Sequence, residues 1–312
     1  MRIILRFAAL LISLVATSTA QDLSGQDSNN PQIQTLPVQG NVYMLVGGGA
    51  NVTVQIGSDG VLLVDSNYAQ LAPRIIAAIR KLSAGPVRYV VLTSVQADHT
   101  GGTEALVKLG ATPAAPSPAL VVADIDVLNR MVKPLPRDPP VPQALWPNDT
   151  YSTPFKDFYF NNEAVIVTHV PAAHTDGDSI VFFRKSDALS VGDIFTPGNY
   201  PVIDTAKGGS VQGLIDGLNR ILDIAVPAKY QEGGTLVIPG HGRLCDEADV
   251  VEFRDMVTII RDRVQDLIKQ GKTLDQAKAA QPTRDYDTQY AAEGSSVTPD
   301  AFVESVFRSL KK

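Results

Sequence analysis

A pattern of short apolar segments occurs twice along this chain and limits the folds open to it. In each half, segments rich in Val, Ile and aromatic side chains alternate with turns that contain Gly, Asn or Asp, and apolar stripes at helical spacing follow them. Strands of this kind bury their apolar faces, and two groups of strands can do so by packing against each other. The pattern therefore predicts an α/β protein in which two sheets pack face to face with helices outside.

The predicted elements follow one another with short connections. Those of the first half are strands at 41–46, 51–56, 61–65 and 87–93, a helix over 71–82, and two further helices near 103–109 and 119–131. A proline-rich connection at 132–147 then leads to the second half. Its predicted elements are strands at 156–160, 163–169, 178–184, 187–192 and 235–238, and helices at 210–225 and near 248–269. Thr273 and Gln276 have the spacing of a capping box, which predicts one more short helix after them.

The first 20 residues differ from the rest of the chain. Arg2 and Arg6 flank an apolar run that ends in small residues, which is typical of a secretory signal. We therefore expect residues 1–20 to be a signal peptide, 21–31 a flexible leader and 32–312 the folded domain. The protein is expected to be exported, either periplasmic or secreted. It should have no stable membrane insertion after signal cleavage, because no other apolar run approaches the roughly 20 residues of a span.

The charge balance narrows the possible partners. The chain has 27 basic and 33 acidic residues, and Arg2 and Arg6 belong to the predicted signal, so the mature chain is more acidic still. An acidic surface repels phosphate backbones, so we expect no nucleic-acid partner and predict a small-molecule substrate instead. The single cysteine, Cys245, excludes a disulfide within the chain. The sequence leaves the oligomeric state open.

Three of the four histidines follow predicted strands directly, in loops that contain Gly or Asp. These loops, together with one further strand end, are Asp98-His99-Thr100-Gly101-Gly102, His174-Thr175-Asp176-Gly177-Asp178, Pro239-Gly240-His241-Gly242 and Val191-Gly192-Asp193. Carboxylates and imidazoles at the ends of adjacent strands meet at one rim of a sheet, which is how zinc sites are assembled. The fourth histidine, His169, alternates within a strand, so we interpret it as a structural residue.

These motifs resemble those of the metallo-β-lactamase-fold hydrolases. That family has a strand ending in Asp, then Thr-His-x-His-x-Asp-His-x-x-Gly, a Gly-His-Thr loop, a Gly-Asp strand end and a Pro-Gly-His-Gly loop. The counterparts here, in the same order, are Leu62–Asp65, Thr93–Gly102, Ala173–Thr175, Gly192-Asp193 and Pro239–Gly242. The resemblance covers residues 33–312. It implies an αβ/βα four-layer sandwich of two mixed sheets, and it implies that Asp65 orients the 94–102 loop by hydrogen bonds.

The resemblance also implies a metal centre, with one departure from the family pattern. Two metal-binding histidines of the family are replaced here by Ser94 and Gln96, whose hydroxyl and amide groups are weak zinc ligands. We therefore expect one Zn²⁺ per chain, with the second site, around His174, weak or empty. The metal ligands that the resemblance implies are Asp98, His99, His174, Asp193 and His241.

The resemblance favours an exported metal-dependent hydrolase of an ester, lactone, thioester or lactam bond. A metal-activated water would attack the bond, Asp98 would orient that water, and His174 would bind substrate or carry a proton. Four protein ligands on one zinc are more typical of a structural site, however. The alternative is therefore a catalytically inactive relative that acts as a binding or scaffold protein. A nuclease or RNA-processing role is disfavoured by the acidic charge and the predicted export.

Overall fold

The computed structural model describes residues 32–111, 117–292 and 294–311. The predicted signal at 1–20 and leader at 21–31 lie outside the described residues. Gln32–Lys312 group into one unit. Among the described residues, every helix is too short or too polar to cross a membrane.

The first sheet contains seven strands of the described residues, arranged in chain order. They are β1 (Gln34–Gln39), β2 (Val42–Val46), β3 (Val52–Gly57), β4 (Gly60–Val64), β5 (Val87–Val91), β6 (Leu120–Asp124) and β7 (Asp149–Tyr151). Pairs from β1 to β4 are antiparallel, and pairs from β4 to β7 are parallel. A hairpin joins β3 to β4, where Gly57 faces Gly60.

The second sheet contains five strands of the described residues, in the order β12-β11-β10-β9-β8. They are β8 (Phe155–Phe160), β9 (Glu163–Val170), β10 (Asp178–Phe183), β11 (Ala188–Ser190) and β12 (Leu236–Ile238). The pairs from β8 to β11 are antiparallel, whereas β11 and β12 run parallel. Both sheets are therefore mixed.

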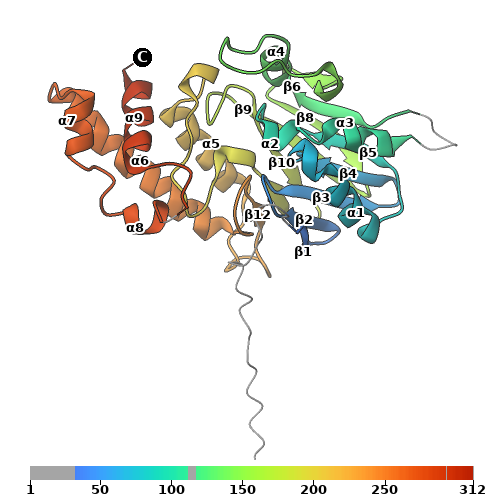
Figure 1. Ribbon diagram of the computed structural model, residues 1–312. Coiled ribbons are helices and arrows are strands. Elements are labelled where there is room, and N and C mark those ends of the chain that lie inside the picture. Colours follow the sequence, from blue (N-terminus) through green and yellow to red (C-terminus); the bar gives the residue numbers. More distant parts are fainter. Residues whose placement is uncertain (1–31, 112–116, 293, 312) are drawn as a thin grey trace, which may run out of the picture. The chain divides into compact units, whose positions relative to one another are not determined.

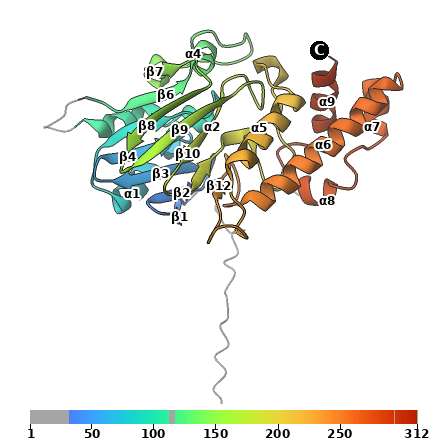
Figure 2. The same cartoon turned by 180° about the vertical axis from the view of Figure 1, so that it is seen from behind.

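Helices cover the outer faces of the two sheets, as Figures 1 and 2 show from opposite sides. Those of the first half are α1 (Ala72–Leu82), α2 (Ala97–Thr100), α3 (Thr103–Val107) and α4 (Ile125–Val132). In the second half, α5 (Val211–Ile224) and α6 (Glu247–Lys269) lie next to the second sheet, and α7 (Leu274–Ala279), α8 (Asp287–Tyr290) and α9 (Pro299–Leu310) lie beyond them. The predicted four-layer αβ/βα sandwich is confirmed.

Alternation along the strands explains why the layers form. In β4, Leu62 and Val64 point toward the second sheet and pack with residues such as Val165 and Val181. Leu63, between them, points the other way and packs under the helices of the first half. Every residue of β4 is buried, because both of its faces are covered.

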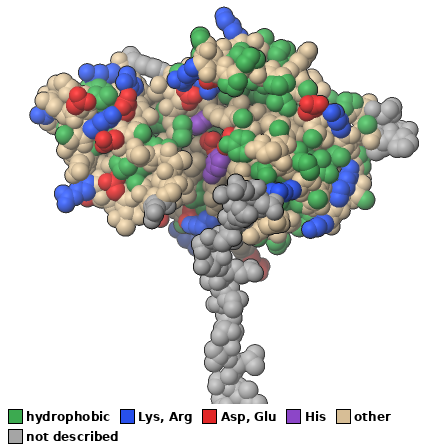
Figure 3. All heavy atoms as spheres, viewed as in Figure 1, with side chains coloured by type: hydrophobic (Ala, Val, Ile, Leu, Met, Phe, Trp, Pro, Cys, Tyr) green, Lys and Arg blue, Asp and Glu red, His purple; other side chains and the backbone are tan. Residues whose placement is uncertain are grey.

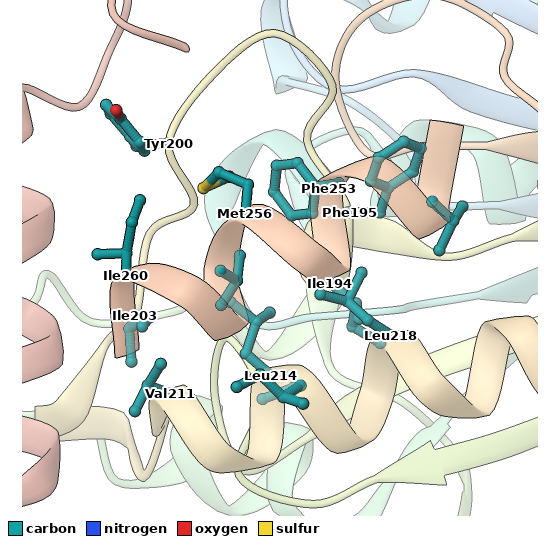
Figure 4. Close-up of a cluster of buried hydrophobic side chains, with 14 of the residues drawn as sticks. Ile194, Phe195, Tyr200, Ile203, Val211, Leu214, Leu218, Phe253, Met256 and Ile260 are labelled. Carbon is teal, nitrogen blue, oxygen red and sulfur yellow. The ribbon is translucent and has the colours of Figure 1, made fainter. Parts of the chain in front are cut away.

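The outer face of the second sheet packs against α5 and α6 in the cluster that Figure 4 shows. Leu214 and Leu218 of α5 face Phe253 and Met256 of α6, in agreement with the apolar stripes of the sequence. Phe195 stacks edge to face on Phe253, with ring centroids 5.2 Å apart. Phe195 follows a strand-end segment of the site, so this core holds that segment in place.

The predicted helix near 119–131 is wrong in its first half. Residues 120–124 form β6, and the helix begins only at Ile125. Val121, Val122 and Ala123 are buried in a parallel strand, where β-branched residues pack well, whereas Leu120 at its start is exposed. Asp124 then accepts a hydrogen bond from the backbone N–H of Asp126 and so starts α4. Strand β7 and helix α9 were not predicted.

The N-terminus of α6 is capped by two hydrogen bonds between Asp246 and Asp249. The carboxylate of Asp246 accepts from the backbone N–H of Asp249, and Asp249 accepts from the backbone N–H of Asp246, each at 3.2 Å. We predict that Asp246→Ala lowers the free energy of unfolding by about 1 kcal/mol, because the backbone N–H of Asp249 loses its partner. Urea denaturation would measure this, with the exposed Asp262→Ala on the same helix as control. Equal effects of both changes would contradict the capping role.

Candidate metal site

The strand-end loops of both sheets meet at one cavity. His99 lies in α2 after β5, His174 after β9, Asp193 in the 3₁₀ turn η4 (Gly192–Ile194) after β11, and His241 after β12. The cavity has a volume of 460 Å³, and Asp98, His174, Asp193 and His241 all line it. Figure 3 shows histidine side chains in the middle of one face of the molecule, with acidic side chains beside them.

Three of the predicted ligands form a close group. One ligand atom each from Asp98, His99 and His241 lies within 4.8 Å of the other two. The Oδ2 atom of Asp98 is 3.1 Å from Nε2 of His241. Asp193 adjoins the group, because its two carboxylate oxygens lie 3.2 Å from Nε2 of His99 and 3.6 Å from Nε2 of His241. One imidazole pair and two carboxylates thus converge, and this donor set suits Zn²⁺.

The tautomer of His99 is set by Asp65. Nδ1 of His99 lies 2.8 Å from Oδ2 of Asp65, so Nδ1–H donates and Nε2 of the neutral ring carries a lone pair. Asp65 also accepts from the backbone N–H and the hydroxyl of Thr93, which orients the loop as expected. Among the described residues, Nε2 of His99 and Oδ1 of Asp193 are buried without a hydrogen-bond partner. In the neutral ring, Nε2 of His99 and a carboxylate oxygen of Asp193 are two buried acceptors 3.2 Å apart. A proton or a metal ion between them satisfies both, so these residues fit a metal ion.

The charges of these carboxylates and imidazoles favour a positive charge at the point where the side chains meet. Burial alone lowers the pKa of His99, but the charges of Asp193 and Asp65 outweigh it and hold that pKa well above its usual value. Burial alone raises the pKa of Asp193, but the charge and the hydrogen bond of His99, together with the other two imidazoles, outweigh burial and lower that pKa. The pKa of Asp98 is likewise lowered, against the effect of burial, by its hydrogen bond with His241. The carboxylates therefore stay ionised and can hold a divalent cation.

His174 lies at the same cavity but has a different partner. Its Nε2 is 4.0 Å from Oδ2 of Asp193 and contacts the side-chain amide of Gln96. Nδ1 of His174 lies 3.0 Å from the carbonyl oxygen of Val202 and so donates to it, which leaves Nε2 as an acceptor for the Gln96 amide. The hydroxyl of Ser94 in turn donates to the side-chain carbonyl oxygen of Gln96. Ser94, Gln96 and His174 thus satisfy one another at the second predicted site.

With the geometry in place, comparisons with known proteins assign the family. A family model described as the metallo-beta-lactamase superfamily matches residues 37–243, which is more than half of the chain. This chain belongs to the metallo-beta-lactamase superfamily. Members of this superfamily are usually metal-dependent hydrolases, in agreement with the group of His and Asp side chains at the cavity. No curated protein is similar enough in sequence to count as a match.

Solved structures share the fold of this chain. The stereoselective inverting sec-alkylsulfatase Pisa1 from Pseudomonas sp. has a TM-score of 0.66 and 16% identity over 90% of this chain and 50% of its own. A metallo-beta-lactamase from Pontibacter korlensis has a TM-score of 0.57 and 16% identity over 73% of this chain and 99% of its own. This superfamily member thus spans about half the length of the sulfatase. At these identities the likeness shows the fold.

Residues outside the predicted motifs hold the loop of His241 in place. The buried side chain of Asn51 donates to the carbonyl oxygens of Pro239 and Gly242, at 2.9 and 3.1 Å, and so fixes the loop that carries His241. Gly240 of that loop lies close to Asp193. A Cβ atom at position 240 would be 2.4 Å from Oδ1 of Asp193, so a side chain there would clash. Asn51 lies 188 residues from Pro239 in sequence, so local patterns give no signal of this contact.

The fourth histidine lies outside the group at the cavity. His169 donates from Nε2 to the carbonyl oxygen of Asp176 at 2.8 Å, and its Nδ1 lies 3.5 Å from Oδ2 of Asp124. Asp126 completes a second group of potential ligand atoms with these two residues. The carboxylate of Asp124 also caps α4, in agreement with a structural role for this part of the molecule.

The contact between Asp65 and His99 gives a testable prediction. Asp65→Asn keeps the shape, and Asn tolerates the positive φ of 64° at this position. An amide nitrogen cannot accept from Nδ1–H of His99, so the ring loses the tautomer that leaves Nε2 free. We predict that zinc affinity falls roughly 10- to 100-fold without loss of the fold. Competition with a chelating dye would measure it, and an unchanged affinity would contradict this role of Asp65.

Proposed function

We propose that this chain is an exported hydrolase that uses one Zn²⁺ held by Asp98, His99, Asp193 and His241. The proposal rests mainly on Nε2 of His99 and Oδ1 of Asp193, which are buried beside a cavity without a hydrogen-bond partner in the described part of the chain. Its substrates would be small molecules with an ester, lactone, thioester or lactam bond. The export part rests on residues 1–20 alone.

Four protein ligands are typical of a closed zinc site, so catalysis here requires that Asp193 bind the ion less tightly or that the ion take a fifth ligand. Asp98, His99 and His241 form the close group, and Asp193 lies beside it. Three ligands with a fourth held less tightly leave a coordination position for a substrate or water. A zinc ion bound here supplies Lewis acidity and makes water a nucleophile near neutral pH. The lowered pKa of Asp98 keeps its carboxylate able to accept a hydrogen bond from that water.

His174 would act on the substrate rather than as a main ligand. The carbonyl of Val202 holds its Nδ1–H, so the unprotonated Nε2 lies at the cavity. When a substrate displaces the amide of Gln96, Nε2 can accept a hydrogen bond or a proton from the substrate. His174 stays within the cavity wall in either case, because its side chain is only 4% exposed.

A binding or scaffold protein is the second candidate. The hydrogen bonds that join Ser94, Gln96 and His174 favour it, because they leave His174 without an obvious catalytic task until a ligand opens them. In this case zinc would stabilise the fold by binding the native state alone. The two candidates agree on metal binding and differ on turnover.

The decisive experiment is a substrate panel with the zinc-loaded protein. Esters, lactones, thioesters and lactams would be tested on the unchanged chain, on His241→Ala and on Val132→Ala as an exposed control. We expect turnover of at least one class, lost by at least about 100-fold in His241→Ala and unchanged in the control. Turnover that survives in His241→Ala would contradict the proposed site. Tight binding of one zinc without turnover of any class would favour the binding protein.

A further inference from the structure

A second cavity adjoins the metal cavity. Its volume is 310 Å³, and Gln96 and Lys207 line both cavities. The amide of Gln96 that contacts His174 on one side therefore also forms part of the wall of the second cavity. Two cavities with common wall residues can hold two parts of one molecule. The second cavity is thus placed to take a group attached to the bond that lies at the metal site.

The wall of this second cavity is mainly apolar. Part of it comes from Val95 in the loop after β5, and most of it comes from the proline-rich connection, including Leu135, Val141 and Leu145. Four prolines of the connection also line the cavity. A proline ring has no N–H and a fixed φ, so this wall presents hydrocarbon on a restricted backbone. Such a wall favours an apolar occupant.

The charged residues of the wall are already paired. They are Arg130, Asp138 and Lys207. Arg130 pairs with Asp176, and Nζ of Lys207 lies 3.1 Å from Oδ2 of Asp138. An ionic ligand would have to compete with these partners and lose its water at an apolar wall, which costs free energy. The pairing therefore favours a neutral group over an anion or a cation.

The same contacts hold the wall in its place before any ligand binds. Nζ of Lys207 also lies 3.1 Å from Oδ2 of Asp204, and Asp204 lines the metal cavity. Within the connection, the indole N–H of Trp146 donates to the carbonyl oxygen of Val141 at 3.1 Å. A cavity that is already formed loses little free energy in ordering its wall when a ligand enters.

We propose that the second cavity binds a neutral alkyl or aryl group of the substrate, so that the chain prefers bonds carrying a long apolar substituent. This inference rests on the proposed function for the location of the scissile bond. Each methylene group buried there should raise kcat/KM roughly fourfold, until the cavity is full. Leu135 is the residue to change, because it lines the cavity and lies outside the hydrophobic cores.

The kinetic test uses p-nitrophenyl acetate, butyrate and octanoate. The substitution Leu135→Trp fills the cavity, and Val132→Trp is a matched control at an exposed position that does not line it. We expect kcat/KM to rise from acetate to octanoate in the unchanged chain and in the control. Leu135→Trp should lower the ratio of kcat/KM for octanoate to kcat/KM for acetate by at least about tenfold. An unchanged ratio of octanoate to acetate in Leu135→Trp would overturn the proposal.

A binding test separates this inference from the proposed function. N-phenylnaphthylamine, a neutral fluorescent probe, would be titrated into the unchanged chain, Leu135→Trp and the metal-site variant His241→Ala. We expect Leu135→Trp to weaken binding at least about tenfold and His241→Ala to leave it unchanged. Probe binding of this pattern without turnover of any ester would refute the hydrolase while supporting an apolar ligand in this cavity. Equal probe binding by Leu135→Trp and the unchanged chain would refute the cavity as the site.

Discussion

The double substitution Ser94→His with Gln96→His should convert this protein from about one bound zinc to about two. The change supplies two imidazoles beside His174 and removes the amide of Gln96 that now occupies Nε2 of His174. Thr93, just before the replaced positions, is held by Asp65 through two hydrogen bonds that the change does not touch. The loop therefore keeps the anchor that positions its side chains.

The control for this experiment is Ser94→Ala with Gln96→Ala. It also frees His174 but adds no imidazole, so it should still bind about one zinc. Metal analysis after gel filtration would count the ions, and calorimetry would give the affinity of the second. A double-histidine variant that folds but still binds one zinc would show that the second site differs by more than these two side chains. In that case the hydrogen bonds among Ser94, Gln96 and His174 would not explain the single metal.

The sequence alone predicted most of the candidate residues that line the cavity, because these residues follow strands. Asp98, His99, Asp193 and His241 each lie in the segment that follows a strand, and parallel strand ends meet at one rim. Their spacing along the chain therefore predicted a common cavity without any knowledge of contacts. His174 was predicted for the same reason and also lines that cavity. Its main hydrogen-bond partner, Gln96, lies 78 residues away and was not predictable from local patterns.

The same reasoning explains the features that the sequence did not predict. Residues 120–123 are apolar throughout, and such a run is compatible with a buried strand or a buried helix. In the folded protein these residues form the largely buried strand β6, and their burial depends on the whole fold rather than on the local sequence. Asn51 was missed because its partners, in the loop of His241, are distant in sequence. Periodicity thus predicts faces and strand ends, whereas contacts between distant loops depend on the tertiary structure.

Zinc binding should be lost when His241 is replaced by Ala. The substitution removes one of the three closely grouped ligands and leaves the carboxylates of Asp98 and Asp193 without the imidazole between them. A site reduced to one imidazole and two carboxylates holds zinc too weakly to survive gel filtration. We predict that zinc falls from about one per chain to nearly none.

Gln96→Ala is the matched control for this loss. Gln96 lines the same cavity but contacts His174 rather than the close group of ligands, so its removal should leave the zinc content unchanged. Circular dichroism would establish that both variants fold. Loss of zinc in Gln96→Ala together with its retention in His241→Ala would move the metal to His174 and contradict the proposed ligands.

Anomalous scattering at the zinc edge from crystals of the zinc-loaded protein would test the central claim most directly. The claim is that one ion binds where Asp98, His99 and His241 converge, with Asp193 beside it. We predict one strong peak in contact with these side chains, with the amide of Gln96 still against His174. Two strong peaks, or a single peak bound by His174 away from His99 and His241, would contradict the claim.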